Sequence, residues 1–252
     1  MFSPVKTDQF IQEFYHNGFI HIKNLFSLEE VEKIKNELEH LYNKAGHLKE
    51  TETINNTQYV VANNAIQRVV WCAGERPQLL KYAHDPRITK IVAQILKSNM
   101  ADQLICQAHY KMPQDEVAFD WHQDSQHRCF GTDLWKNLNH MGSYVQTLMA
   151  VDEMDLDNGP MQMVPLTGMM GNLALDKLKD HGTSFEKLYD VKNTQTVTMT
   201  PGSILFFGPY SVHGSAPNNS DRPRRVFING YAYPNCNDRL YPGCGKGLRI
   251  NL

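Results

Sequence analysis

The sequence predicts a mainly β protein, a jelly roll with a helical N-terminal layer packed on it. Apolar residues recur at helical spacing in the first hundred residues, short β-rich segments begin near Asp102, and turns with Gly and Pro separate those segments. Many short strands at such spacing are typical of a sandwich or barrel. We therefore expect one domain over 1–252, with a mostly helical layer over 1–101, a jelly-roll core over 102–234 and a tail over 235–252.

The composition is that of an ordinary globular chain. Of its 252 residues, 41% are hydrophobic and 21% charged, which excludes wholesale disorder. The net charge of −2 argues against a dedicated binder of nucleic acid or of an anionic membrane. No apolar run approaches the ~20 residues of a membrane-spanning helix. The N-terminus shows no secretory signal and the five cysteines form no C-x-x-C pair, so we expect free thiols in a reducing cytoplasm.

The N-terminal layer is expected to contain several helices. A first helix ends at Gly18, and residues 19–25 then alternate like a strand. Ser27 and Glu30 can form a capping box, after which apolar residues recur at helical spacing. The polar segment 47–58 predicts an exposed loop.

Two prolines then fit the first turns of further helices, over 77–83 and 86–96. A helical interruption is expected over 173–181. The β-rich segments of the expected core are 103–111, 118–122, 143–151, 161–164, 195–199, 203–207 and 224–233.

Two histidines and an aspartate form the candidate metal site. His122 and Asp124 stand two residues apart near the end of an expected strand, where side chains i and i+2 point to the same side. His213 follows a strongly apolar strand and is expected at the mouth of the barrel. Two histidines and a carboxylate make the facial triad of non-haem Fe(II) oxygenases, which leaves positions open for a chelating cosubstrate and for dioxygen. The alternative is three unrelated polar residues on loops.

An arginine run offers a clamp for a carboxylate. Arg224 begins a β-rich segment shortly after His213, and a guanidinium can hold a carboxylate by two parallel hydrogen bonds. A five-carbon diacid could then reach from the metal to Arg224. Its neighbours Arg222 and Arg225 are the alternatives, and strand period favours Arg224 as the inward-facing member.

The stretch from Cys106 to Tyr233 resembles the phytanoyl-CoA dioxygenase family of Fe(II)- and 2-oxoglutarate-dependent oxygenases, which includes ectoine hydroxylase. The resemblance covers about half of the chain. The matching motifs are WHQD (121–124), NGPMQMVP (158–165), PGSILFF (201–207) and HGSAPNNSDRPRR (213–225).

The resemblance implies a double-stranded β-helix with iron on His122, Asp124 and His213. It also implies that Arg224 binds the far carboxylate of 2-oxoglutarate, with help from the Ser215 hydroxyl, and that His109 is a further polar contact of the cosubstrate. The cofactors would be Fe(II), 2-oxoglutarate and O2. The expected reaction is hydroxylation of an unactivated C–H bond in a small or medium-sized molecule, with release of succinate and CO2.

Two comparisons with the family bear on the reaction and the substrate. Asp124 is intact, which favours hydroxylation over halogenation. Pro165–Gly168 stands where many relatives carry a Pro-Gly-Ser-His run, which leaves the substrate open. The rivals are a non-catalytic jelly-roll module that binds a metal or ligand, and a zinc hydrolase, for which no general base is evident. Polar segments 51–59 and 126–141 are expected to flank the mouth and to become ordered on substrate binding. Substrate identity and oligomeric state stay open.

Overall fold

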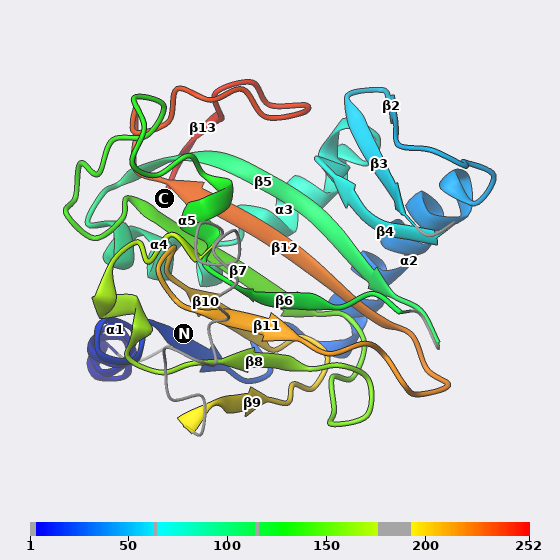
Figure 1. The fold of residues 1–252 in the computed structure, drawn as a ribbon, viewed down its shortest axis with the longest axis horizontal. Helices are drawn as coiled ribbons and strands as arrows, with labels where there is room; N and C mark the ends of the chain where they lie inside the picture. The colour runs from blue at the N-terminus through cyan, green and yellow to red at the C-terminus, as the bar shows by residue number, and fades with distance from the viewer. Residues whose placement is uncertain (1–3, 63–64, 114–115, 176–192) are drawn as a thin grey trace.

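Two antiparallel sheets face each other, and helices cover the outer side of the larger one (Figure 1). The computed structural model describes residues 4–62, 65–113, 116–175 and 193–252. In order across the large sheet run β1 (Phe19–Ile22), β10 (Ile204–Phe207), β7 (Tyr144–Ala150), β12 (Arg224–Ala232), β5 (Met100–Lys111), β4 (Ala65–Val70), β3 (Thr57–Ala62) and β2 (Glu52–Ile54), and β13 (Leu248–Asn251) also pairs with β5. The small sheet has the order β6 (Phe119–His122), β11 (His213–Ser215), β8 (Met161–Met163) and β9 (Gln195–Val197). This is the jelly roll that the sequence predicts.

The helices form a layer behind the large sheet. They are α1 (Pro4–Asn17), α2 (Leu28–Ala45), α3 (Leu80–Ala83) and α4 (Pro86–Leu96), with short 3-10 turns at Cys72–Gly74, Pro77–Leu79 and Thr167–Met170. The predicted capping box of α2 is confirmed, because the Ser27 hydroxyl accepts from the Glu30 amide and the Glu30 carboxylate accepts from the Ser27 amide. Within the described ranges, no helix is long and apolar enough to span a membrane.

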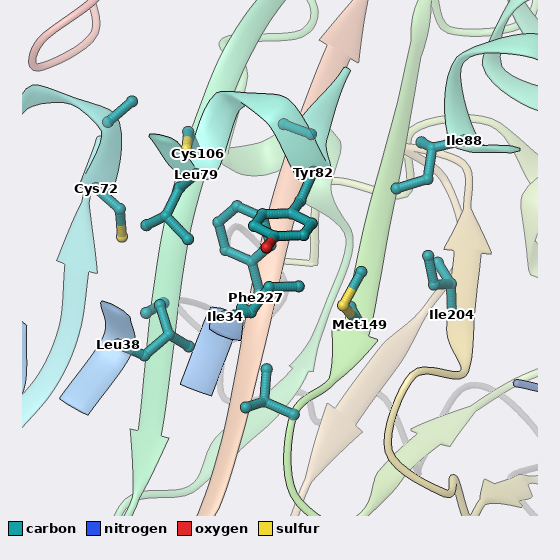
Figure 2. Close-up of a cluster of buried hydrophobic side chains, with 14 of the residues drawn as sticks. Ile34, Leu38, Cys72, Leu79, Tyr82, Ile88, Cys106, Met149, Ile204 and Phe227 are labelled. Atoms are coloured by element: carbon teal, nitrogen blue, oxygen red, sulfur yellow. The ribbon is translucent and has the colours of Figure 1, made fainter. Parts of the chain in front are cut away.

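An apolar core fills the space between this layer and the sheet. Ile34 and Leu38 of α2 and Tyr82 of α3 meet Met149 and Phe227 of the central strands (Figure 2). All five side chains are at most 9% exposed. Their burial holds the helical layer on the sheet and leaves the other sheet face free to form the site.

Alternation along β12 divides its side chains between two cores. Phe227 packs against the helices, whereas Val226 and Ile228 pack between the two sheets. Because neighbours on a strand point to opposite faces, Arg224 shares the inner side with Val226, and Arg225 shares the outer side with Phe227. This parity positions the site described below.

The expected loop over 47–58 is wrong. Strands β2 and β3 form a hairpin there, and β4 joins that hairpin to β5. The hairpin lies at the sheet edge, so one of its faces can stay polar, and Asn55 and Asn56 form its turn at φ 49° and 60°. Consecutive Asn residues tolerate this left-handed backbone, and they were the overlooked signal.

Two further expectations need correction or lie out of reach. The strand expected over residues 19–25 is confirmed as β1, but the N-terminal layer also contains the unexpected strands β2–β4. The expected tail over 235–252 contains β13, whose Ile250 pairs with Ala101 of β5. The expected helical interruption over 173–181 falls mostly outside the described residues.

Candidate active site

His122, Asp124 and His213 converge at the inner end of the small sheet. His122 closes β6 and His213 opens β11, and the two lie directly opposite in the antiparallel register. Their ring centroids are 4.2 Å apart. Asp124 begins the short helix α5 (Asp124–His127), and one ligand atom from each of the three side chains lies within 4.8 Å of the others. The structure therefore brings together the three residues that the sequence singled out.

Backbone carbonyls orient both imidazole rings. Nδ1 of His122 is 2.6 Å from the Asp120 carbonyl oxygen, and Nδ1 of His213 is 2.9 Å from that of Ser211. A carbonyl can only accept, so each Nδ1 carries the proton and each Nε2 keeps its lone pair for a metal. Burial lowers the pKa of His213 to about 3, which keeps its ring neutral at pH 7, the form that binds a metal.

Asp124 presents a carboxylate oxygen with no bond of its own. Asp124 is only 4% exposed, and its Oδ2 has no hydrogen-bond partner among the described residues. Burial would raise the pKa of Asp124, but nearby groups, Arg128 foremost, outweigh it, so the pKa lies below its ordinary value. A buried, ionised carboxylate with one unpartnered oxygen, beside two imidazoles that keep their Nε2 lone pairs, fits a divalent first-row metal.

Gln123 fixes the bend that directs Asp124 inward. Its amide donates to the carbonyls of Gly171 at 2.9 Å and Tyr210 at 2.6 Å, and its side-chain oxygen accepts from the Leu173 amide at 2.7 Å. Gln123 is fully buried and has these three partners, so it ties the β6–α5 corner to neighbouring loops. The WHQD motif thus combines two candidate ligands with a structural anchor.

A pocket of about 300 Å³ opens beside the three residues, between the two sheets. Its apolar walls include Ile105, Leu148, Phe207 and Ile228. Its polar lining includes Gln58, Arg68, Gln107, His109, His127, Arg128, Gln146, Ser215, Arg224 and Arg239. A concave pocket that combines apolar walls with convergent polar groups is typical of a small-molecule site.

Arg224 is the one member of the arginine run that lines the pocket. It is 2% exposed, its Nη2 donates to the Gly159 carbonyl at 2.6 Å, and its Nε has no partner in the described part of the chain. Burial lowers its pKa to about 10. By contrast, Arg225 binds Asp152 with two bonds of 2.7 and 2.9 Å, and Arg222 binds Asp155 on the surface.

The NGPM turn supports this arginine. Gly159 has φ +71°, and a Cβ built there would lie 2.2 Å from the carbonyl oxygen of Ala216. Only glycine therefore lets the turn approach the segment that follows His213. This close approach brings the Gly159 carbonyl to Arg224.

Ser215 and His109 lie in the same pocket. The Ser215 hydroxyl accepts from the Lys111 ammonium at 2.8 Å, which leaves its own proton to donate. The His109 ring stacks on Phe119 with centroids 5.3 Å apart, and its Nε2 has no partner in the described ranges. Burial, aided by Arg68 and Arg224, lowers the pKa of His109 to about 3.

Several pocket residues escaped sequence reasoning. Gln107 and Gln146 occupy inward positions on β5 and β7, and polar residues at such positions in apolar strands were a usable signal. Arg68, Arg128 and Arg239 come from β4, from the residue after α5 and from the segment before β13. No spacing in the sequence links these three positions, because only the fold brings them to one wall.

The segments expected at the mouth contribute in part. Gln58 of the first segment lines the pocket, although from a strand rather than a loop, and His127 and Arg128 of the second line it as well. All five cysteines are free thiols, as expected.

The chain is similar to several known proteins. The family model "Phytanoyl-CoA dioxygenase (PhyH)" matches residues 14–226. The ectoine dioxygenase of Bordetella bronchiseptica is 25% identical over 236 residues, which cover 86% of this chain and 73% of the relative. The peroxisomal phytanoyl-CoA dioxygenase of Bos taurus is 24% identical over 245 residues, which cover 89% and 68% of the two chains.

The fold also has close counterparts among solved structures. The apo crystal structure of EctD from S. alaskensis matches with a TM-score of 0.70 at 18% identity, and the match covers 96% of this chain and 80% of that one. The family match spans most of the chain, and the fold agrees with it. The chain therefore belongs to the phytanoyl-CoA dioxygenase family of Fe(II)- and 2-oxoglutarate-dependent oxygenases.

Proposed function

We propose that this dioxygenase hydroxylates an unactivated C–H bond of a small or medium-sized molecule and releases succinate and CO2. In this proposal His122, Asp124 and His213 hold the iron. The observation that carries it is the pairing of the candidate triad, whose ligand atoms lie within 4.8 Å of one another, with the buried Arg224, whose contacts among the described residues include no acidic group. A metal-binding module without turnover does not need that second feature, and neither does a zinc hydrolase.

Bound iron, together with 2-oxoglutarate and O2, supplies the oxidising chemistry. The chain supplies ligation and orientation. The carbonyls of Asp120 and Ser211 fix the two imidazole rings, and Gln123 fixes the corner from which Asp124 projects. Rigid support of this kind preserves metal affinity, because the ligands need not reorganise on binding.

Arg224 is proposed to bind the far carboxylate of 2-oxoglutarate. One of its nitrogens already donates to Gly159, which fixes the plane of the guanidinium, and Nε remains available. Ser215 can donate a further hydrogen bond to the same carboxylate. His109 stays neutral and contributes its unpartnered Nε2 as a polar contact of the cosubstrate.

The site and the cysteines also suggest the type of reaction, the kind of substrate and the cellular compartment. Asp124 keeps a carboxylate in the proposed ligand set, which favours hydroxylation over halogenation. A pocket of about 300 Å³ suits a small-molecule substrate rather than nucleic acid or a membrane. The five free thiols favour a reducing compartment, and we propose the cytoplasm.

The experiment is cosubstrate turnover. The protein is loaded anaerobically with Fe(II), given carboxyl-labelled 2-oxoglutarate, and exposed to O2 in the presence of a metabolite extract. Wild type should release labelled CO2, and Asp124→Ala should release none above background. Asp221→Ala is the matched control, since that carboxylate is 95% exposed.

The rivals predict different results. Metal binding without CO2 release from wild type would favour the non-catalytic module. Zinc-dependent hydrolysis that needs neither O2 nor 2-oxoglutarate would favour the hydrolase. Either result would overturn the proposal.

A further inference from the structure

Three arginines that the proposed function leaves unused line the more exposed part of the pocket. Arg68, Arg128 and Arg239, here called the arginine cluster, all border the cavity. Arg128 is 6% exposed, whereas Arg68 is exposed. The proposed cosubstrate arginine, Arg224, lies in the buried part at 2% exposure. The pocket therefore holds three guanidinium groups in addition to that of Arg224.

The members of the arginine cluster are neighbours. The guanidinium groups of Arg128 and Arg239 both donate to the carbonyl oxygen of His127. Both also lie near the Tyr241 ring, with Cζ 5.6 and 5.0 Å from its centroid. Arg68 lines the same pocket, and burial, followed by the charge of Arg128, lowers its pKa.

Among the described residues, none of the three arginines forms a salt bridge, and the carboxylate that acts on Arg128 is that of the candidate metal ligand Asp124. Arg128 uses Nη2 to donate to Tyr144 and Gln146 at 3.0 and 3.2 Å, which fixes its plane. The Nε of Arg128 is buried and has no hydrogen-bond partner among the residues that the structure describes.

Charge balance shows what the cluster is free to bind. The formal charges of a divalent iron, the 2-oxoglutarate dianion, Asp124 and Arg224 cancel, and the neutral imidazoles add nothing. Three positive charges then remain on one wall of the pocket. Repulsion among like charges at a partly desolvated site is relieved when an anion binds between them.

We propose that the substrate is a small organic acid whose carboxylate or phosphorus oxyanion binds the arginine cluster while its carbon skeleton extends toward the triad. This inference rests on the proposed function. The pocket must also hold 2-oxoglutarate, so its volume of about 300 Å³ leaves room only for a small molecule. Apolar residues such as Leu148 and Ile228 on the same lining suit the carbon skeleton.

The test is calorimetry on holoenzyme loaded with Mn(II), which does not turn over, and 2-oxoglutarate. Three probes of similar shape differ in charge: butyrate, propylphosphonate and the neutral butyramide. Wild type should bind the two anions and not butyramide, and the tighter of the two anions identifies the head group. Arg128→Gln and the exposed Arg68→Gln should each weaken anion binding about tenfold or more. Arg222→Gln, a surface arginine paired with Asp155, is the matched control.

The affinity for 2-oxoglutarate separates this inference from the proposed function. It should change little in Arg68→Gln and Arg128→Gln. Equal binding of butyramide and butyrate, absence of anion binding, or full anion affinity in both variants would overturn the inference. If 2-oxoglutarate affinity falls in Arg128→Gln and not in Arg224 variants, the cluster is the cosubstrate site, and the inference is wrong. If wild type binds the anions but no 2-oxoglutarate, the proposed function fails instead.

Discussion

Arg224 and Arg225 are adjacent on β12, carry the same guanidinium and are similarly buried, at 2% and 7% exposure, yet their surroundings are opposite. Arg225 faces the helical layer and has Asp152 as a bidentate partner. Arg224 faces the pocket, and its described contacts include no acidic group. Burying a charge without a partner is costly, so an unpaired buried arginine marks a place where a ligand is expected to supply the anion.

The largest expected effect is on stability, at Arg225. Arg225→Ala removes both guanidinium bonds to Asp152 and leaves that carboxylate with the 2.9 Å bond from the backbone amide of residue 225 and the 3.7 Å contact to Lys35. The free energy of unfolding, measured with urea, should fall by about 3 kcal/mol. Arg224→Met, measured without 2-oxoglutarate, should leave the stability unchanged or raise it, because the relief of burying an unpaired charge offsets the lost hydrogen bond to the Gly159 carbonyl. A larger loss at Arg224 than at Arg225 would contradict the comparison.

The second effect is on 2-oxoglutarate affinity, which should depend on Arg224 rather than on Arg225. Arg224→Met should weaken 2-oxoglutarate binding to the Mn(II)-loaded protein by about 2–3 kcal/mol, the value of hydrogen bonds to a charged group. Arg222→Met is the matched control and should bind 2-oxoglutarate as wild type does. Calorimetry measures the 2-oxoglutarate affinity of both variants. Unchanged affinity in Arg224→Met would mean that another residue binds the far carboxylate of 2-oxoglutarate.

The third effect concerns the turn at Gly159, whose carbonyl accepts a hydrogen bond from Arg224. Gly159→Ala places a methyl group against the Ala216 carbonyl and shifts the turn that anchors Arg224. We expect a loss of stability of about 1–3 kcal/mol together with weaker 2-oxoglutarate binding. Gly171→Ala is a stringent control, since Gly171 has the same φ of +71° but has no atom within 4 Å of the added Cβ. Equal effects in both variants would trace the loss to backbone strain alone.

The smallest effect, counted per pH unit, is a pH dependence from His109. Burial lowers its pKa to about 3 in the folded protein, against about 6.5 in the unfolded chain. Stability from the neutral ring is therefore complete above pH ~6.5 and is lost as the pH falls toward 3, where only the unfolded chain takes up the proton. The slope should reach at most about 1.4 kcal/mol per pH unit. Urea unfolding of His109→Gln should show a shallower decline than wild type, and His47→Gln, at an exposed position, controls for loss of a histidine.

Local chemistry explains which parts of the fold could be predicted from the sequence. The capping box of Ser27 and the apolar periodicity of α2 depend on neighbours within a few residues, so they were visible. The hairpin of β2 and β3 was not, because its polar residues suit an exposed loop equally well and only pairing with β4 decides the matter. Strand β13 depends on β5, which lies far away in the sequence.

The candidate site divides in the same way. His122, Asp124 and Arg224 were accessible because strand parity decides which side chains face inward. The arginine cluster was not, since Arg68, Arg128 and Arg239 come from three separate segments that meet only in the folded chain. Residues that share no strand or helix carry no common periodicity, and their convergence is a property of the tertiary structure.

The most direct test of the central claim is a crystal structure of the protein with Mn(II) and 2-oxoglutarate. The account predicts a metal bound by Nε2 of His122, Nε2 of His213 and a carboxylate oxygen of Asp124, with the far carboxylate of 2-oxoglutarate on Arg224. A metal bound elsewhere, or a cosubstrate carboxylate seated on Arg128 with Arg224 still unpaired, would contradict it.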